Sequence, residues 1–264
     1  MQLTHSSMVY TSAARRTLII YYGTELPTQD RARQLRDATV VLQPYHPLCE
    51  FGGFADYFPH ALRFVYFNPT AAHPQLVIDP HVKAATLGHD ARWNLERLDL
   101  RRGAARRFAI TQGQLALRIA GVHGLFVDDL DWWDHPTGRR HARSVLGAVT
   151  DARACPTAWF VNRGFGFWKR LPGLAAVLLE GLSPYQLDRM DLLESSWAIT
   201  VLLPALRHAR ARGADVYSLT YDPAAVGWQP GGVAASAVAA LAGEPLLARP
   251  QLDRWPHMLT EGSG

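Results

Sequence analysis

Short hydrophobic runs recur along this chain, and longer stretches with apolar residues at helical spacing separate them. Several runs are apolar throughout, such as LIIYY, TVVLQ and AVLLE, which is typical of strands buried on both faces. The alternation predicts a parallel sheet covered by helices. The eight predicted strands are Thr17–Tyr22, Thr39–Tyr45, Leu62–Asn68, Gly124–Asp128, Ala158–Asn162, Ala176–Glu180, Asp215–Tyr221 and Pro245–Arg249.

Eight strand-and-helix units in 264 residues predict one α/β domain over residues 1–264, a (β/α)8 TIM barrel. The connection from Pro69 to Ala104 is long and only partly regular, as functional lids often are. Residues 1–14 and 261–264 are expected to fray. The predicted helices are Gln29–Asp37, Arg106–Ala120, Gly138–Asp151, Met190–Arg212 and Val233–Leu241.

Polar side chains end nearly every predicted strand. Barrel enzymes place their active sites at the carboxyl ends of the strands, so these residues are expected to converge at one mouth. Each of them can hydrogen-bond a polyol, which favours a carbohydrate ligand. The candidates are Tyr22, Tyr45, His46, Asn68, Asp128, Asp129, Asp131, Asn162, Arg163, Glu180, Tyr221, Asp222 and Arg249.

Two of these residues are carboxylates that directly follow buried runs. Asp128 follows Gly-Leu-Phe-Val, and Glu180 follows Ala-Val-Leu-Leu. Such a pair suits glycoside hydrolysis, in which one group protonates the leaving oxygen and the other attacks or activates water. The structural alternative is that they cap helices or pair with Arg163 and Arg249. Spacing alone leaves both interpretations open.

The acidic stretch from Asp128 to His135 has two further interpretations. Its oxygen-rich side chains could hold Mg²⁺ or Ca²⁺, although it does not match an EF-hand loop. Trp132 or Trp133 could stack on a sugar, or could simply pack the loop. The GxSxG, GxxxxGK[ST] and HExxH motifs are absent. We therefore predict no cofactor and no bound metal, with a metal-assisted hydrolase as an alternative.

The formal net charge is +4, and all but two of the cations are arginine. The densest stretch, from Arg97 to Arg107, is interpreted as a solvated helix face in preference to a nucleic-acid site. Cys49 and Cys155 are expected to be buried thiols. No apolar run reaches the roughly 20 residues of a membrane span, and no secretory h-region is visible. The chain is thus expected to be cytoplasmic as written, or trimmed from a secreted precursor.

Three stretches together resemble glycoside hydrolase family 114, the endo-α-1,4-polygalactosaminidase family. Residues 121–131, GVHGLFVDDLD, resemble its "GfdGvFLDtlD" strand. Residues 159–165, WFVNRGF, resemble its "NRG" strand, and residues 177–182, VLLEGL, resemble its "vEsl" strand. An early Tyr-Tyr-Gly and the late segment from Leu247 to Asp253 extend the match over almost the whole chain.

The resemblance implies a (β/α)8 barrel that cleaves an amino-sugar polysaccharide, with Asp128 as nucleophile and Glu180 as acid/base. By position, Tyr22, Asn162 and Tyr221 would contact the substrate, and a monomer is expected. Relatives often end the third strand in Gly-Glu, where this chain has Asn68, and they are usually secreted. A positive net charge would not attract a cationic polymer, although an acidic mouth could. A barrel that binds sugar without cleaving it remains the second hypothesis.

Overall fold

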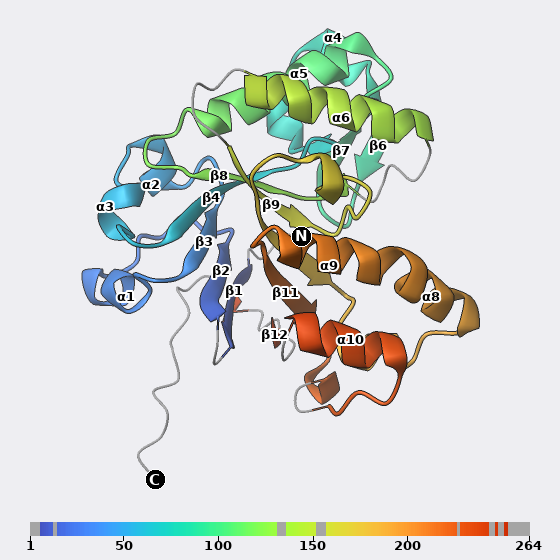
Figure 1. The fold of residues 1–264 in the computed structure, drawn as a ribbon. Helices are drawn as coiled ribbons and strands as arrows, with labels where there is room; N and C mark the ends of the chain where they lie inside the picture. Colours follow the sequence, from blue (N-terminus) through green and yellow to red (C-terminus); the bar gives the residue numbers. More distant parts are fainter. Residues whose placement is uncertain are drawn as a thin grey trace.

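The computed structural model describes residues 6–12, 15–130, 136–151, 157–225, 228–242, 246–247 and 251–252. Its main element is a curled sheet with helices along its outer face (Figure 1). Seven neighbouring strands of this sheet run parallel, as an α/β barrel requires. They are β2 (Arg15–Tyr21), β3 (Thr39–Leu42), β4 (Leu62–Phe67), β8 (Gly124–Val127), β9 (Ala158–Asn162), β10 (Leu174–Glu180) and β11 (Asp215–Thr220).

Short strands continue the sheet at both ends. On one side, β12 (Leu246–Leu247) pairs parallel with β11, inside the predicted eighth strand. On the other side, β1 (Ser6–Ser12) pairs antiparallel with β2 and with β13 (Gln251–Leu252). Within residues 1–14, which the sequence predicts to fray, Ser6–Ser12 pairs with β2 as a hairpin. Residues 261–264 lie outside the described part of the chain.

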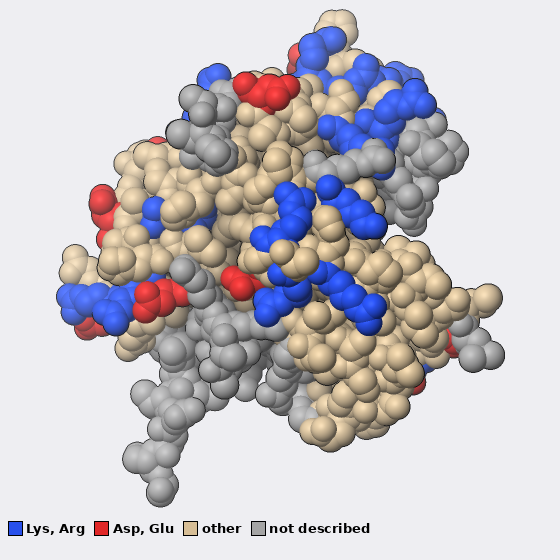
Figure 2. Space-filling model, viewed as in Figure 1, with Lys and Arg blue, Asp and Glu red and all other residues tan. Residues whose placement is uncertain are grey.

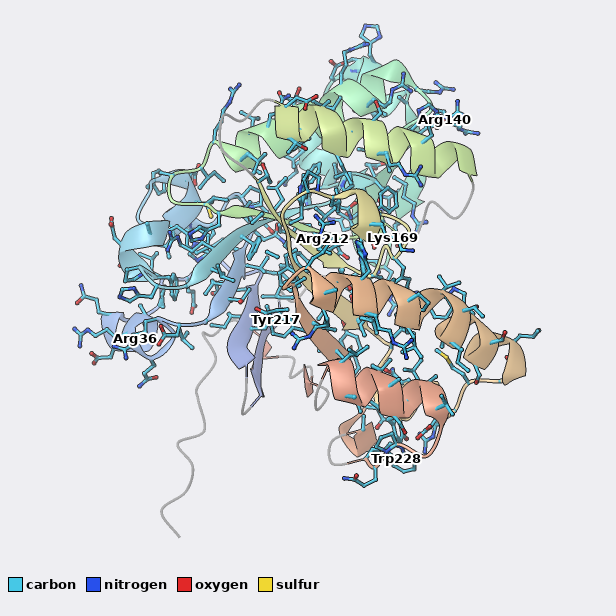
Figure 3. The ribbon with its side chains drawn as sticks, in the orientation of Figure 1. Arg36, Arg140, Lys169, Arg212, Tyr217 and Trp228 are labelled. Carbon is cyan, nitrogen blue, oxygen red and sulfur yellow. The ribbon has the colours of Figure 1, made fainter. Side chains whose placement is uncertain are left out.

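The buried residues of the sheet fall into two groups, one on each face. The larger group packs between the sheet and the helices. The smaller group lines the concave face, and aromatic rings dominate it: Phe126 and Phe160 meet edge to face with ring centroids 4.8 Å apart. Tyr217 belongs to this inner group and lies at the centre of the view in Figure 3. The inner group is Leu18, Ile20, Val41, Phe64, Phe126, Phe160, Ala176, Leu178, Tyr217 and Leu219.

The longer helices lie near their predicted positions. Short helices and turns fill the other connections, and the one between β9 and β10 contains the 3-10 turn η3 (Trp168–Arg170). The longer helices are α5 (Gly103–Leu117), α6 (Pro136–Asp151), α9 (Leu203–Ala211) and α10 (Val233–Ala242). The shorter helices are α1 (Gln29–Gln34), α2 (Pro47–Glu50), α3 (Phe54–Tyr57), α7 (Pro184–Leu187) and α8 (Leu192–Trp197).

The predicted helix Met190–Arg212 is present as one unbroken helical path from Leu192 to Ala211, but its hydrogen-bond pattern changes along the way. It consists of α8, a π-helical stretch over Ala198–Leu202, and α9. Pro204 explains the change, because a proline inside a helix lacks the N–H that would bond the preceding turn and crowds its carbonyl. Gly213 then ends α9 with φ +77°, as its position after the last helical residue predicts.

The long connection after β4 contains a small sheet of its own, and its buried residues join the main core. It contains an antiparallel sheet of β5 (Ala71–Ala72), β7 (Leu95–Leu98) and β6 (Thr86–Asp90), with α4 (Pro80–Lys83) beside it. Figure 1 shows β6, β7 and α4 together beside α5 and α6. The connection contains more regular secondary structure than its sequence predicts. Its strands are only two to five residues long, and strands this short leave little hydrophobic pattern in the sequence.

The arginine-rich stretch is solvated but is not one helix face. Arg97 lies in β7 and pairs with Asp90, while Arg101 and Arg102 pair with Asp99 before α5 begins. Local carboxylates thus neutralise much of this charge. Figure 2 shows other Lys and Arg side chains across the centre of the same view, where Figure 3 labels Lys169 and Arg212.

Cys49 is buried and carries a free thiol, whose pKa burial raises to about 12. This confirms the prediction for Cys49, whereas Cys155 lies outside the described residues. Among the described helices, none is both long and apolar enough to cross a membrane.

Candidate functional site

Strand register brings the predicted carboxylates to one edge of the sheet. Val127 pairs with Phe67 on one side and with Val161 on the other. The residues that follow these three, Asp128, Asn68 and Asn162, must therefore emerge side by side. The sequence predicted this convergence, because the carboxyl ends of parallel strands share an edge.

The side chains of the candidate site form a second layer above the inner core. In these strands, an inward-facing core residue is followed two positions later by a polar or aromatic residue. Successive strand side chains alternate between faces, so positions two apart share a face. The inner core residues Ile20, Phe64, Phe126, Phe160, Leu178 and Leu219 are followed in this way by Tyr22, Tyr66, Asp128, Asn162, Glu180 and Tyr221. The candidate site is thus a polar layer directly above an apolar one.

Asp128 accepts three hydrogen bonds. Tyr66 Oη donates to its Oδ2 over 3.1 Å, while Asn162 Nδ2 and the Asp129 backbone N–H donate to its Oδ1 over 2.8 and 2.9 Å. Asp129 adopts a left-handed φ of 56°, an uncommon conformation for a residue other than glycine and one that recurs at functional sites. These donors fix the Asp128 carboxylate in one orientation.

Glu180 accepts hydrogen bonds at both of its carboxylate oxygens. Asn162 Nδ2 donates to Oε2 over 2.5 Å, and the Tyr221 hydroxyl donates to Oε1. The pKa of Tyr221 is raised by partial burial and by the Glu180 charge, so this phenol stays protonated and keeps donating. Neutral side chains, those of Tyr66, Asn162 and Tyr221, therefore donate hydrogen bonds to the two carboxylates.

Asn162 links the two carboxylates through a single atom. Its side-chain nitrogen carries two hydrogens, and both are used, one toward each carboxylate. Its Oδ1 is buried without a hydrogen-bond partner. Asp128 Oδ1 and Glu180 Oε2 consequently lie no farther apart than about 5.3 Å, the sum of the two bond lengths.

The Asp128 carboxyl holds its proton far more tightly than a carboxyl in water. Burial, with added repulsion from the Asp129 and Glu180 charges, raises its pKa to about 7. The hydrogen bonds from Asn162 and the Asp129 backbone act in the opposite direction but do not outweigh burial. A strongly perturbed carboxyl beside a second one is a frequent mark of an acid–base site.

Tyr66 is the functional candidate that strand-end reasoning missed. It lies one residue before the end of β4, and its hydroxyl contacts Asp128. Its ring meets that of Tyr22 edge to face at 5.6 Å. Burial and the Asp128 charge raise the pKa of both phenols, which places Tyr22 close to the carboxylates as predicted. Alternation along β4, two residues beyond inward-facing Phe64, would have revealed Tyr66.

Asn68 and Asp129 support the site from one side. Asn68 Nδ2 donates to Asp129 Oδ2 over 2.6 Å, while its Oδ1 accepts from both the backbone and hydroxyl of Thr70 and from the Ala71 N–H. Asn68 is predicted as a substrate contact, and in the structure its polar atoms tie the end of β4 to the loop after β8.

The remaining predicted residues are not brought to the carboxylates by the described contacts. Asp222 accepts a hydrogen bond from the Ala224 N–H at 2.9 Å and caps the turn η5 (Pro223–Ala225). Asp131, Trp132 and Arg249 lie outside the described residues. Within the described part of the chain, no group of three or more His, Cys, Asp or Glu side chains is arranged to hold a metal ion.

The fold is found in solved glycoside hydrolases. The glycoside hydrolase domain of PelA from Pseudomonas aeruginosa matches with a TM-score of 0.56 and 21% identity, covering 78% of this chain and 84% of that one. Ega3 of Aspergillus fumigatus, solved in complex with galactosamine, matches with a TM-score of 0.55 and 13% identity, covering 91% and 99%. At these identities the likeness establishes a shared fold. Neither a protein-family model nor a curated protein sequence matches this chain.

Proposed function

We propose that this chain is a glycoside hydrolase with Asp128 and Glu180 as its catalytic pair. The single observation that carries the proposal is the bridge formed by Asn162, which holds two carboxylates together at the carboxyl edge of a parallel sheet. The fold shared with the PelA and Ega3 structures supports the same class. We further propose that the sheet closes into a complete (β/α)8 barrel, a step that the parallel strand β12 supports.

The spacing of the pair favours retention of configuration. Retaining glycosidases hold their two carboxyl groups about 5–5.5 Å apart, whereas inverting enzymes leave roughly 6.5–9.5 Å for a water. The bridged oxygens lie no farther apart than about 5.3 Å, because one amide nitrogen contacts both, so they are closer than the spacing of inverting enzymes. A single nitrogen could not span that longer spacing.

In the first step of the proposed reaction, Asp128 in its ionised form, which prevails above its pKa of about 7, attacks the anomeric carbon while Glu180 protonates the leaving oxygen. The glycosidic bond breaks, and an ester joins the sugar to Asp128. In the second step Glu180 removes a proton from water, whose oxygen attacks the same carbon and releases the Asp128 carboxylate. The three donors on Asp128 suit a nucleophile, because hydrogen bonds to a carboxylate fix its position and stabilise it when it leaves.

For the substrate, we propose a galactosamine-containing polysaccharide cleaved within the chain. The resemblance of the GVHGLFVDDLD, WFVNRGF and VLLEGL stretches to glycoside hydrolase family 114 supports this choice. The galactosamine bound in the Ega3 structure supports it independently. Acidic side chains at the site, Asp128, Asp129 and Glu180, suit an amino sugar better than an acidic one.

The native chain, Asp128→Asn and Glu180→Gln should be compared on α-1,4-linked galactosamine polymers, with and without N-acetyl groups. Loss of either carboxyl is expected to reduce turnover by roughly 10²–10⁴-fold, because each takes a direct part in bond making or proton transfer. A reducing-end assay of the released products measures turnover. Proton NMR of the anomer that forms first shows whether the configuration is retained. Circular dichroism checks that both variants fold.

Two outcomes would contradict the proposal. If the native chain and both variants bind a polymer alike and none cuts it, the protein is a binding barrel. If a chelator abolishes turnover and added Mg²⁺ or Ca²⁺ restores it, the chemistry belongs to a metal-assisted hydrolase. An inverted first product would leave the carboxylate pair standing but overturn the assignment of Asp128 as nucleophile.

A further inference from the structure

A second polar cluster is centred on Asp188, just after α7. Its carboxylate accepts three hydrogen bonds, from Trp228 Nε1 at 3.0 Å and from the backbone N–H groups of Gly231 and Gly232 at 2.8 and 2.7 Å. All three donors belong to the connection between β11 and α10, which begins at Tyr221. Asp188 therefore ties this connection to the segment that follows Glu180.

The backbone of the loop is shaped for this contact. A Cβ atom on Gly232 would lie 2.8 Å from Asp188 Oδ1, closer than real Cβ contacts allow. Glycine at this position lets the main chain approach the carboxylate directly. The loop conformation is consequently specified by the sequence and held by charge-assisted hydrogen bonds, which are the stronger kind.

Trp228 is held on a second side by other rings. Its indole meets the ring of Tyr185 edge to face at 5.2 Å, and Tyr185 is buried. The Arg189 guanidinium lies 3.7 Å from the Tyr185 centroid and 5.7 Å from that of Trp228. Trp228 nevertheless stays 42% exposed, and Figure 3 shows it at the rim of the molecule below α10.

A half-exposed tryptophan whose N–H is already satisfied offers a fixed apolar face to solvent. Such a face suits the C–H side of a pyranose ring, and a ring that is already immobile loses little entropy when it binds. Arg189 places a positive charge near that face. An uncharged sugar is therefore favoured there over one that carries an ammonium group.

We propose that Trp228 forms a distal subsite that stacks on an uncharged hexose or N-acetylhexosamine unit of the bound polymer. This inference rests on the proposed function, since it concerns the same polymer. The site sits on the connection that carries Tyr221, whose hydroxyl contacts Glu180. The proposal therefore places the path of the polymer from the catalytic pair along the connection that carries both Tyr221 and Trp228.

The test compares the native chain, Trp228→Ala, Trp228→Phe and Val233→Ala on a disaccharide and an octasaccharide of α-1,4-linked N-acetylgalactosamine. Loss of the stacking contact is expected to lower kcat/KM on the octasaccharide about tenfold more than on the disaccharide. Phenylalanine should restore part of this difference because it keeps an aromatic face. Val233→Ala is the matched control, because it truncates a 75% exposed apolar side chain on the neighbouring first turn of α10 and should keep the native ratio.

A direct binding measurement separates this inference from the proposed function. Calorimetry with the octasaccharide uses Asp128→Asn, alone and combined with Trp228→Ala, so that cleavage does not interfere. If the native chain cleaves the polymer but Trp228→Ala loses activity equally on the disaccharide and the octasaccharide, the subsite proposal is wrong and the hydrolase proposal stands. If the native chain cuts nothing but Trp228→Ala weakens binding about tenfold, the hydrolase is wrong and the subsite stands. Absence of both cutting and binding overturns the two together.

Discussion

At the scale of single residues, the candidate site is built from groups that constrain one another. Asn162 uses both hydrogens of its amide on the two carboxylates, and Tyr66 and Tyr221 each hold one carboxylate from the far side. The pair therefore cannot separate without breaking several hydrogen bonds. The cost is a carboxyl, Asp128, that burial keeps protonated until about pH 7.

That raised pKa makes a prediction about stability. Between about pH 4 and pH 7 the folded chain keeps the Asp128 proton, while the unfolded chain, with an ordinary carboxyl pKa near 3.9, releases it. Because the folded state binds more protons in this range, the free energy of unfolding contributed by Asp128 falls as the pH rises. Asp128→Asn removes this dependence.

Asp128→Asn is therefore expected to be more stable than the native chain at pH 8. Its melting temperature should rise by about 2–4 °C for each kcal/mol that the substitution adds to the free energy of unfolding. At pH 4 the two should melt alike. Differential scanning calorimetry across this pH range measures the difference. Equal melting temperatures at both pH values would mean that Asp128 is not buried as described.

At the scale of elements, the strands depend on close backbone contacts. Gly124 opens β8, and a Cβ atom there would lie only 1.7 Å from the Ala158 carbonyl oxygen of β9. The backbone pairing of the two strands holds this carbonyl close to residue 124. The same pairing sets the positions of Asp128 and Asn162, so moving the strands apart would also disturb the site. Glycine at position 124 is consequently required by the fold.

Gly124→Ala should therefore destabilise the chain by at least the roughly 1–3 kcal/mol typical of overpacking. Gly147→Ala is the control, because Gly147 lies inside α6 with open space around it, and alanine favours a helix by about 0.5–1 kcal/mol. Urea unfolding of both variants compares the two effects. A Gly124→Ala variant as stable as the native chain would contradict the register between β8 and β9.

The sequence predicted the elements well where hydrophobic periodicity was strong. Seven predicted strands match observed ones closely, since buried parallel strands are apolar throughout. It failed for β1, whose SSMVYTS sequence carries little apolar signal and whose pairing depends on the distant β13. It predicted the helix from Met190 to Arg212 but not the π-helical stretch inside it, which lies just before Pro204.

For the candidate site, the sequence predicted which residues lie together but not the contacts between them. Residues at strand ends were found because the sheet edge collects them, and Asp128, Glu180, Asn162, Tyr22 and Tyr221 do lie together. The bridging role of Asn162 could not be predicted, since it depends on the stagger between β9 and β10. The tie between Asp188 and Trp228 joins residues 40 positions apart and has no sequence motif.

At the scale of the whole molecule, charge should affect how the proposed polymer substrate arrives. The formal net charge is +4, and Lys and Arg spread over the face seen in Figure 2. A deacetylated galactosamine polymer is also cationic, so long-range repulsion slows their encounter, and salt weakens that repulsion because the Debye length falls from about 30 Å at 0.01 M to about 10 Å at 0.1 M.

We expect kcat/KM on a deacetylated polymer to rise severalfold between 0.01 M and 0.1 M salt, a range over which electrostatic steering changes on-rates by roughly tenfold or more. The fully N-acetylated polymer is neutral and serves as the control, with little expected change. Initial rates at low substrate concentration measure both. A fall in kcat/KM on the deacetylated polymer with added salt would mean that the acidic site, and not the net charge, governs the approach.

The antiparallel pairing of β1 with β2 and β13 has a consequence for how the chain reaches this fold. Ser6 pairs with Leu252, so β1 must wait for a segment that is synthesised much later than itself. During translation, β1 can form a hairpin with β2 while its other edge stays unpaired until β13 emerges. The pairing of β1 with β13 is therefore later than that of β1 with β2, and the rate of synthesis sets when it can happen.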